Sequence, residues 1–171
     1  MAPQKEVVLR LASMRYLKAG VSEEDFHEYS TNYHAPKAAI IQARHGALRV
    51  SQIHSPTALR NLFKEKLPWV VRPGWKVDDH DISVAVWVRT SEQMQAIVTD
   101  PDFQSLIAGD DKIIDVENVT VTAGWEEVYI EDGKIVNIED GKSLYPPFAE
   151  CVKVGDLSVR SEVTAEEAKN I

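Results

Sequence analysis

Residues 21–54 read VSEEDFHEYSTNYHAPKAAIIQARHGALRVSQIH, and the rest of the chain is organised around them. The start of this stretch is typical of a helix. Ser22 offers a hydroxyl to free backbone amides, and the three acidic residues that follow favour the positive end of a helix. Phe26, Tyr29 and Tyr33 recur at helical spacing and are predicted to face the core. The stretch therefore begins with an amphipathic helix.

The same stretch then predicts a break, a second helical piece and a strand. The residue before Pro36 disfavours helical backbone, so the first helix is expected to end there and a new one to begin. Gly46 is typical of the residue that ends a helix. From residue 47 to residue 54 the side chains are expected to point alternately to two faces, as they do in a strand. One of these faces is apolar at its start and ends in the polar residues Gln52 and His54.

Alternation and turn residues predict further elements on both sides of this stretch. Strands are expected at 5–16, 81–89 and 114–125, and helices at 57–66, 90–98 and 101–108. The resulting order predicts an α+β fold of the ferredoxin-like βαββαβ type, an antiparallel sheet with helices on one face. Beyond it, Asp132-Gly133 between apolar runs predicts a C-terminal β-hairpin extension, and Asp140-Gly141 marks another turn.

Composition excludes several classes of function. The formal net charge of −8 over 171 residues argues against nucleic-acid binding, which needs a positive surface to displace counterions. No apolar run approaches the length of a membrane span, and the N-terminal apolar run contains arginines that a signal peptide would lack. The single cysteine, Cys151, allows no intramolecular disulfide. A soluble, cytoplasmic protein is the default expectation.

Four of the five histidines fall in the opening stretch: His27, His34, His45 and His54. Histidine titrates near neutrality, so this clustering points to proton chemistry, although single histidines are more often solvated or satisfied in a core. Their spacings match no metal-ligand motif, and no phosphate loop, nucleophile elbow or dinucleotide fingerprint is present. The sequence therefore predicts neither a metal site nor a cofactor.

Aromatic residues supply candidate walls for a ligand. Trp69 and Trp75 lie in a proline-broken loop that is expected to fold over a ligand, the domain's own core or a second subunit. Trp87 stands among small residues on one face of its predicted strand, which leaves space beside it. The expected substrate-binding residues are Tyr29, Ser30, Tyr33, His45, Trp69, Trp75 and Trp87.

Between Glu6 and Trp125 the chain resembles the EthD-domain family of the dimeric α+β barrel superfamily. The matching motifs are D-F-H-E-Y-x-x-x-Y-H-A-P, R-H-G-A-L-R-V-S-Q-I-H and, later, D-P-D-F followed by Asp110-Asp111. The resemblance implies a homodimer that pairs through its sheets, with a ligand cavity in each subunit. It also implies that the family's recurrent histidines fall on His34 and His54. Ser30 departs from the aromatic residue common in relatives, which bears on pocket size.

This resemblance divides the chain into an EthD-like domain, residues 1–125, and a C-terminal extension, residues 126–171. It also implies an enzyme of fungal-type polyketide secondary metabolism. The expected function is a cofactor-independent lyase that decarboxylates an aromatic polyketide-type acid, with His34 and His54 as acid and base. The alternatives are a cyclase or dehydratase of the same fold, a non-catalytic barrel that binds an aromatic ligand, and a purely structural dimerisation domain with a filled interior.

Overall fold

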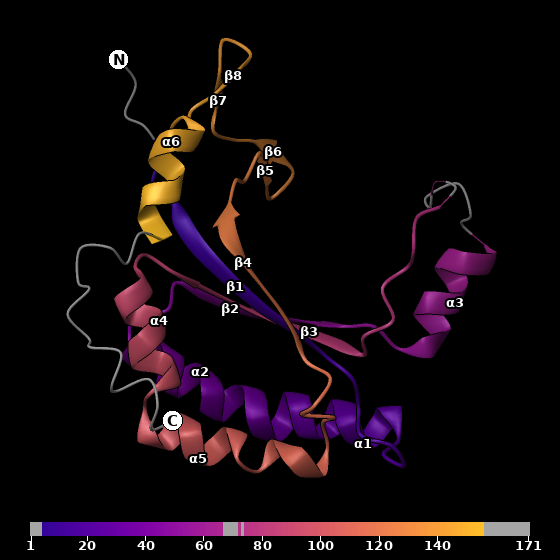
Figure 1. Ribbon diagram of the computed structural model, residues 1–171. Helices are drawn as coiled ribbons and strands as arrows, with labels where there is room; N and C mark the ends of the chain where they lie inside the picture. Colours follow the sequence, from indigo (N-terminus) through magenta and orange to yellow (C-terminus); the bar gives the residue numbers. More distant parts are fainter. Residues whose placement is uncertain (1–4, 67–71, 73, 156–171) are drawn as a thin grey trace.

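The computed structural model describes residues 5–66, 72 and 74–155. Its centre is a four-stranded antiparallel sheet with the strand order β2-β3-β1-β4 (Figure 1). The strands are β1 (Val8–Arg15), β2 (Arg49–His54), β3 (Ile82–Val88) and β4 (Thr120–Glu126). Helical segments follow β1 and β3, so the predicted α+β, ferredoxin-like βαββαβ fold is confirmed.

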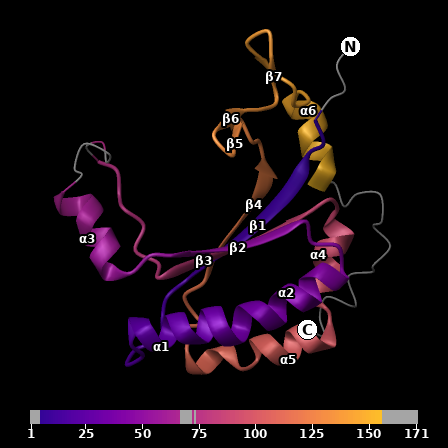
Figure 2. The same ribbon diagram turned by 180° about the vertical axis from the view of Figure 1, so that it is seen from behind.

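Helices cover one face of this sheet, as Figures 1 and 2 show from opposite sides. They are α1 (Glu23–Glu28), the π-helix η1 (Tyr29–His34), α2 (Ala35–Arg44), α4 (Ser91–Val98) and α5 (Pro101–Ile107), whereas α3 (Thr57–Glu65) stands away from this layer. Alternate strand residues point into the layer, and Val86 and Val88 of β3 pack there against Ile97 of α4. The two-residue period of the strands thus places the main core under the helices.

The predicted break at Pro36 is wrong. The chain stays helical through Ala35, whose N–H donates to the carbonyl of Ser30, five residues earlier. Proline has no N–H and its ring crowds the carbonyl four residues back, and a wider turn of π type relieves that crowding without ending the helix. The exposure of Tyr33 is a second correction. This ring is 48% exposed, whereas Phe26 is buried as predicted.

The helix caps are predicted correctly, because each depends on residues that are close to it in the sequence. Ser22 accepts a hydrogen bond from the Asp25 amide, and Thr90 forms a reciprocal capping box with Gln93 at the start of α4.

The last strand is shorter than its apolar pattern predicts. Residues 114–119 precede β4, and Ile114 makes only an isolated bridge to Leu17.

Two small hairpins extend from the end of β4. They are β5 (Ile130–Glu131) with β6 (Lys134–Ile135), and β7 (Ile138–Glu139) with β8 (Lys142–Ser143). Both turn through an Asp-Gly pair in which Asp132 and Asp140 have positive φ, as the hairpin signals predict. The helix α6 (Phe148–Cys151) and the 3₁₀-helix η3 (Val152–Gly155) follow. Among the described residues, no helix is both long and apolar enough to span a membrane.

Candidate functional site

A buried carboxylate, Asp110, joins three side chains from distant parts of the chain. It begins the 3₁₀-helix η2 (Asp110–Lys112) after α5 and is 3% exposed. Its Oδ1 lies 2.9 Å from Nδ1 of His34 and accepts the hydroxyl of Tyr29 at 3.0 Å. Its Oδ2 lies 3.4 Å from Nη1 of Arg15, the last residue of β1. Asp110 therefore bridges a cation and an imidazole.

The π-helix explains why Tyr29 and His34 reach the same carboxylate. In an α-helix of about 3.6 residues per turn, side chains five apart point about 140° away from each other. A turn closed by hydrogen bonds between residues five apart brings such side chains back to one side. The feature that overrides the predicted helix break is thus the one that assembles the site.

Burial and charge shift the pKa of two side chains in this cluster. Burial raises the pKa of Tyr29, and the negative charge and hydrogen bond of Asp110 raise it further. Burial lowers the pKa of the Arg15 guanidinium, while the adjacent Asp110 opposes that change. The Tyr29 hydroxyl is therefore a lasting hydrogen-bond donor to Asp110.

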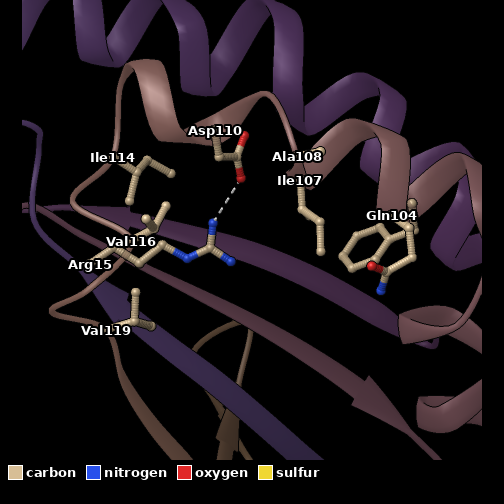
Figure 3. A pocket seen from close by; sticks show the side chains of 9 residues that line it. Arg15, Gln104, Ile107, Ala108, Asp110, Ile114, Val116 and Val119 are labelled. Atoms are coloured by element: carbon tan, nitrogen blue, oxygen red, sulfur yellow. Dashed lines mark hydrogen bonds and ion pairs between the residues drawn. The ribbon is translucent and has the colours of Figure 1, made fainter. Parts of the chain in front are cut away.

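A pocket of about 330 Å³ opens beside this cluster, between the helix-facing side of the sheet and α5 (Figure 3). Arg15 and Asp110 form its polar part. Nε and Nη1 of Arg15 bind Ser13 and Asp110, and Figure 3 shows the remaining guanidinium nitrogen turned into the pocket. The apolar wall consists of Phe103, Ile107, Ile114, Val116 and Val119. A pocket of this size and character suits a small, mostly apolar ligand with one anionic group.

The two histidines predicted as catalytic lie in different surroundings. His34 is buried and faces Asp110. His54, at the end of β2, packs against the ring of His27 and lines a second pocket with it. Burial and the adjacent His27 lower the pKa of His54. The structure thus pairs each histidine with a different partner instead of with the other.

The other predicted ligand contacts are dispersed. Tyr33 is on the surface, stacked on Tyr29, and Ser30 is buried, with its carbonyl accepting the Gln52 amide. Nε2 of His45 lies 2.6 Å from Asp100, the N-cap of α5, so this imidazole links two helices. Two tryptophans fall in the predicted loop. Trp75 is 60% exposed beside Arg72, and Trp69 lies outside the described residues.

Trp87 lies on the sheet face opposite the helices. Its ring is buried between the guanidinium groups of Arg10 and Arg49, at 5.3 and 4.6 Å, and its Nε1 donates to Glu126 at 2.8 Å. A broad hollow of about 600 Å³ lies over this cluster. The space expected beside Trp87 is therefore partly filled by arginine side chains.

Sequence reasoning missed Arg15 and Asp110 as site residues. A signal existed for Arg15, because it follows Leu9 and Leu11 at two-residue spacing and so falls on the helix-covered face of its strand. Asp110 belongs to the Asp110-Asp111 pair of the family motif, but nothing in the sequence tells which of the two identical residues is buried; Asp110 is buried and Asp111 exposed.

Comparison with known proteins agrees with this architecture. Residues 18–117 match the EthD domain, which is more than half of the chain. The chain therefore belongs to the EthD domain family.

Three curated relatives come from filamentous fungi. A putative oxygenase of Aspergillus terreus is 34% identical over 86% of this chain and 92% of its own length. The dehydratase IacD of Pestalotiopsis fici is 29% identical over 81% of this chain and 98% of its own. The decarboxylase NsrE of Aspergillus novofumigatus is 32% identical over 71% and 80%, respectively.

Proposed function

We propose that this chain is an enzyme, a cofactor-independent lyase that decarboxylates an aromatic polyketide-type acid in the pocket beside Arg15. The observation that carries the proposal is the buried Asp110 carboxylate, which bridges Arg15 and His34 at the edge of an apolar pocket. A decarboxylase needs a cation for the substrate carboxylate, a proton donor and an apolar wall, and these three features adjoin here.

Each group has a definite part in the proposed reaction. The guanidinium nitrogen of Arg15 that points into the pocket holds the substrate carboxylate, and the apolar wall packs against the ring system. When the carbon–carbon bond breaks, carbon dioxide leaves and its bonding electrons remain on the substrate carbon, which then takes one proton. The Asp110–His34 pair supplies this proton: the proton held between Asp110 and Nδ1 of His34 passes to the substrate carbon, and the pair takes up one proton from water before the next turnover. Tyr29 holds Asp110 in place by its hydrogen bond.

Two of the three relatives support lyase chemistry without selecting the bond that is broken, whereas the third is named a putative oxygenase. One is named a decarboxylase and another a dehydratase. Dehydration is the second candidate, because the same Asp110–His34 pair can take a proton from carbon and return one to a leaving hydroxyl.

The test is to incubate the purified protein with aromatic and β-keto polyketide acids and to follow products by mass spectrometry. Loss of carbon dioxide supports decarboxylation, and loss of water supports the second candidate. We expect Asp110→Asn and His34→Gln to lower kcat by about 10²-fold or more, the range of a positioned acid–base group. The matched control is His80→Gln, since His80 contacts Asp78 and does not line this pocket. Full turnover in both site variants, with circular dichroism showing intact folding, would refute this assignment.

We further propose that a second copy covers the sheet face that carries Trp87, giving a homodimer. Support comes from the location of this face opposite the helices and from the broad hollow over it (Figure 1). Light scattering at micromolar concentration tests the proposal, and a monomeric mass would contradict it.

A further inference from the structure

A further apolar hollow, the α4 pocket, lies on the same side of the sheet as the pocket beside Arg15. It measures about 560 Å³. Leu9 and Leu11 of β1 form its floor, and Met94 and Val98 of α4 form one wall. Side chains on a strand alternate between its two faces, so Leu9, Leu11 and Arg15 all point to the helix-covered face. Both pockets therefore lie over the same strand.

The two pockets are consecutive along one pair of strands. Leu11 and Ala123 are partners in the register of β1 and β4, and the next pair on this face is Ser13 with Val121. The pocket beside Arg15 begins directly after that pair. Ser13 has a small side chain and Val121 is 58% exposed, so neither closes the passage between the two pockets.

The helices α4 and α5 connect the two pockets above the sheet. Phe103 of α5 lines the pocket beside Arg15 and also packs against the core cluster beneath α4. Gln104 lines the same pocket, where Figure 3 shows it, and its side chain donates a hydrogen bond to the carbonyl of Val98 in the α4 pocket. The two pockets thus form one trough from Arg15 to Leu9, about 20 Å long at roughly 3.3 Å per strand residue.

The charged groups of this trough are concentrated at one end. Arg15 and Asp110 lie there, whereas the lining of the α4 pocket is mostly apolar. Arg10 is the charged residue in that lining, and its guanidinium lies over the ring of Trp87 at 5.3 Å, on the other face of the sheet. Apolar surface left open in this way is typical of a ligand groove. The trough therefore matches a molecule with an anion at one end and an apolar chain behind it.

We propose that the substrate of this site is an elongated aromatic acid whose carboxylate binds Arg15 and whose unbranched alkyl tail lies in the α4 pocket. The proposal rests on the Arg15 anchor of the proposed function. The pocket beside Arg15, about 330 Å³, takes the ring that bears the carboxylate, and the α4 pocket adds about 560 Å³ for the tail. Each methylene group placed there leaves water, so the length of the tail selects among acids that share one ring.

The test measures binding of 4-alkylbenzoic acids to the full-length protein by titration calorimetry. The alkyl chains run from methyl to dodecyl, and each acid is kept below the concentration at which it forms micelles. A fully buried methylene group raises affinity about fourfold, and the trough is open to solvent on one side, so we expect about twofold per methylene. The gain should end once the tail is longer than the trough.

A ring placed inside the α4 pocket should remove this gain. Ala123 is exposed on the edge strand β4, so Ala123→Phe should fold, which circular dichroism checks. This variant should bind 4-decylbenzoic acid about tenfold more weakly or worse and 4-methylbenzoic acid within about twofold of the wild type. The matched control is Thr99→Phe, which adds the same ring at an exposed position outside the trough. Arg15→Gln should weaken the binding of both acids by the same factor.

Two results would overturn the proposal. One is equal affinity for all tail lengths, as expected if another part of the chain or a second copy filled the α4 pocket. The other is a tail-dependent gain that persists in Ala123→Phe. The lyase assay gives a separate answer. Tail-dependent binding without loss of carbon dioxide or water from the polyketide acids would support this proposal and refute the proposed reaction, and turnover without any effect of tail length would do the reverse.

Discussion

Removing the charge of Asp110 while keeping its shape is the sharpest test of the site's architecture. In Asp110→Asn the amide nitrogen must point either toward Arg15 or toward the Tyr29 hydroxyl and His34. In the first orientation the amide faces the Arg15 donors and that contact is lost, in the second the Tyr29 hydroxyl and His34 lose their acceptor, and in both Arg15 stays 20% exposed without its counter-charge. The variant therefore loses interaction energy without creating a cavity.

The size of the effect follows from these contacts. Hydrogen bonds to a charged group contribute about 1.5–3 kcal/mol each, and an amide retains about half of this. The long Arg15 contact adds about 1 kcal/mol or less, because it is partly exposed. The free energy of unfolding should therefore fall by about 2–3 kcal/mol. For a chain of this size the melting temperature should fall by about 4–12 °C.

Urea unfolding followed by circular dichroism measures this loss. The matched control is Asp111→Asn, which changes the exposed neighbour and should stay within about 0.5 kcal/mol of the wild type. A double-mutant cycle with Tyr29→Phe should give a coupling energy of about 1–2 kcal/mol. Equal stability of Asp110→Asn and wild type, or an equal loss in the Asp111 variant, would refute the reasoning.

Three further outcomes are expected. Because the pKa of His54 is lowered, its contribution to stability is full above about pH 6.5 and declines as the pH falls through its folded pKa. In urea unfolding at a series of pH values, His54→Gln should flatten this decline of the free energy of unfolding, and an unchanged pH dependence would contradict the prediction. The hydrogen bond with His45 lowers the pKa of Asp100, so the contribution of this contact to the free energy of unfolding is present above about pH 4 and lost below it. His45→Gln should therefore make stability fall less steeply in acid, and equal acid-unfolding midpoints in variant and wild type would contradict this. Gly46 has a φ of +82°, and an added Cβ would lie 2.5 Å from Nε2 of Gln93, so Gly46→Ala should lower the free energy of unfolding by about 1–2 kcal/mol, whereas no change by urea unfolding would show that the turn relaxes.

The sheet and its turns follow from the sequence alone. Residues 82–88 alternate around valines, and that period by itself specifies a strand with two faces. Ser22 and Thr90 cap their helices through contacts with residues only three positions away, and Asp132-Gly133 forms its predicted turn. Local chemistry decides these features, so the order of elements and the fold class could be predicted.

The helix through Pro36 could not be predicted from local preference. The residue before a proline favours a break, but the carbonyl of Ser30, five residues before Ala35, accepts the hydrogen bond of the Ala35 amide and so closes a wider turn. The carbonyl of Ser30 also receives the side chain of Gln52 from the adjacent strand. The packing of the sheet against this helix outweighs the backbone preference of one residue.

By itself, the sequence determined the inventory of the site: five imidazoles, many carboxylates, and an arginine whose strand period places it on the covered face. Only the tertiary structure decided the pairings, because His34 and Asp110 are 76 residues apart, and His27 meets His54 across a helix and a strand. A histidine has the same chemistry wherever it stands in the chain. What packs against it decides whether it contacts a carboxylate or another imidazole, and that depends on how the helices lie on the sheet.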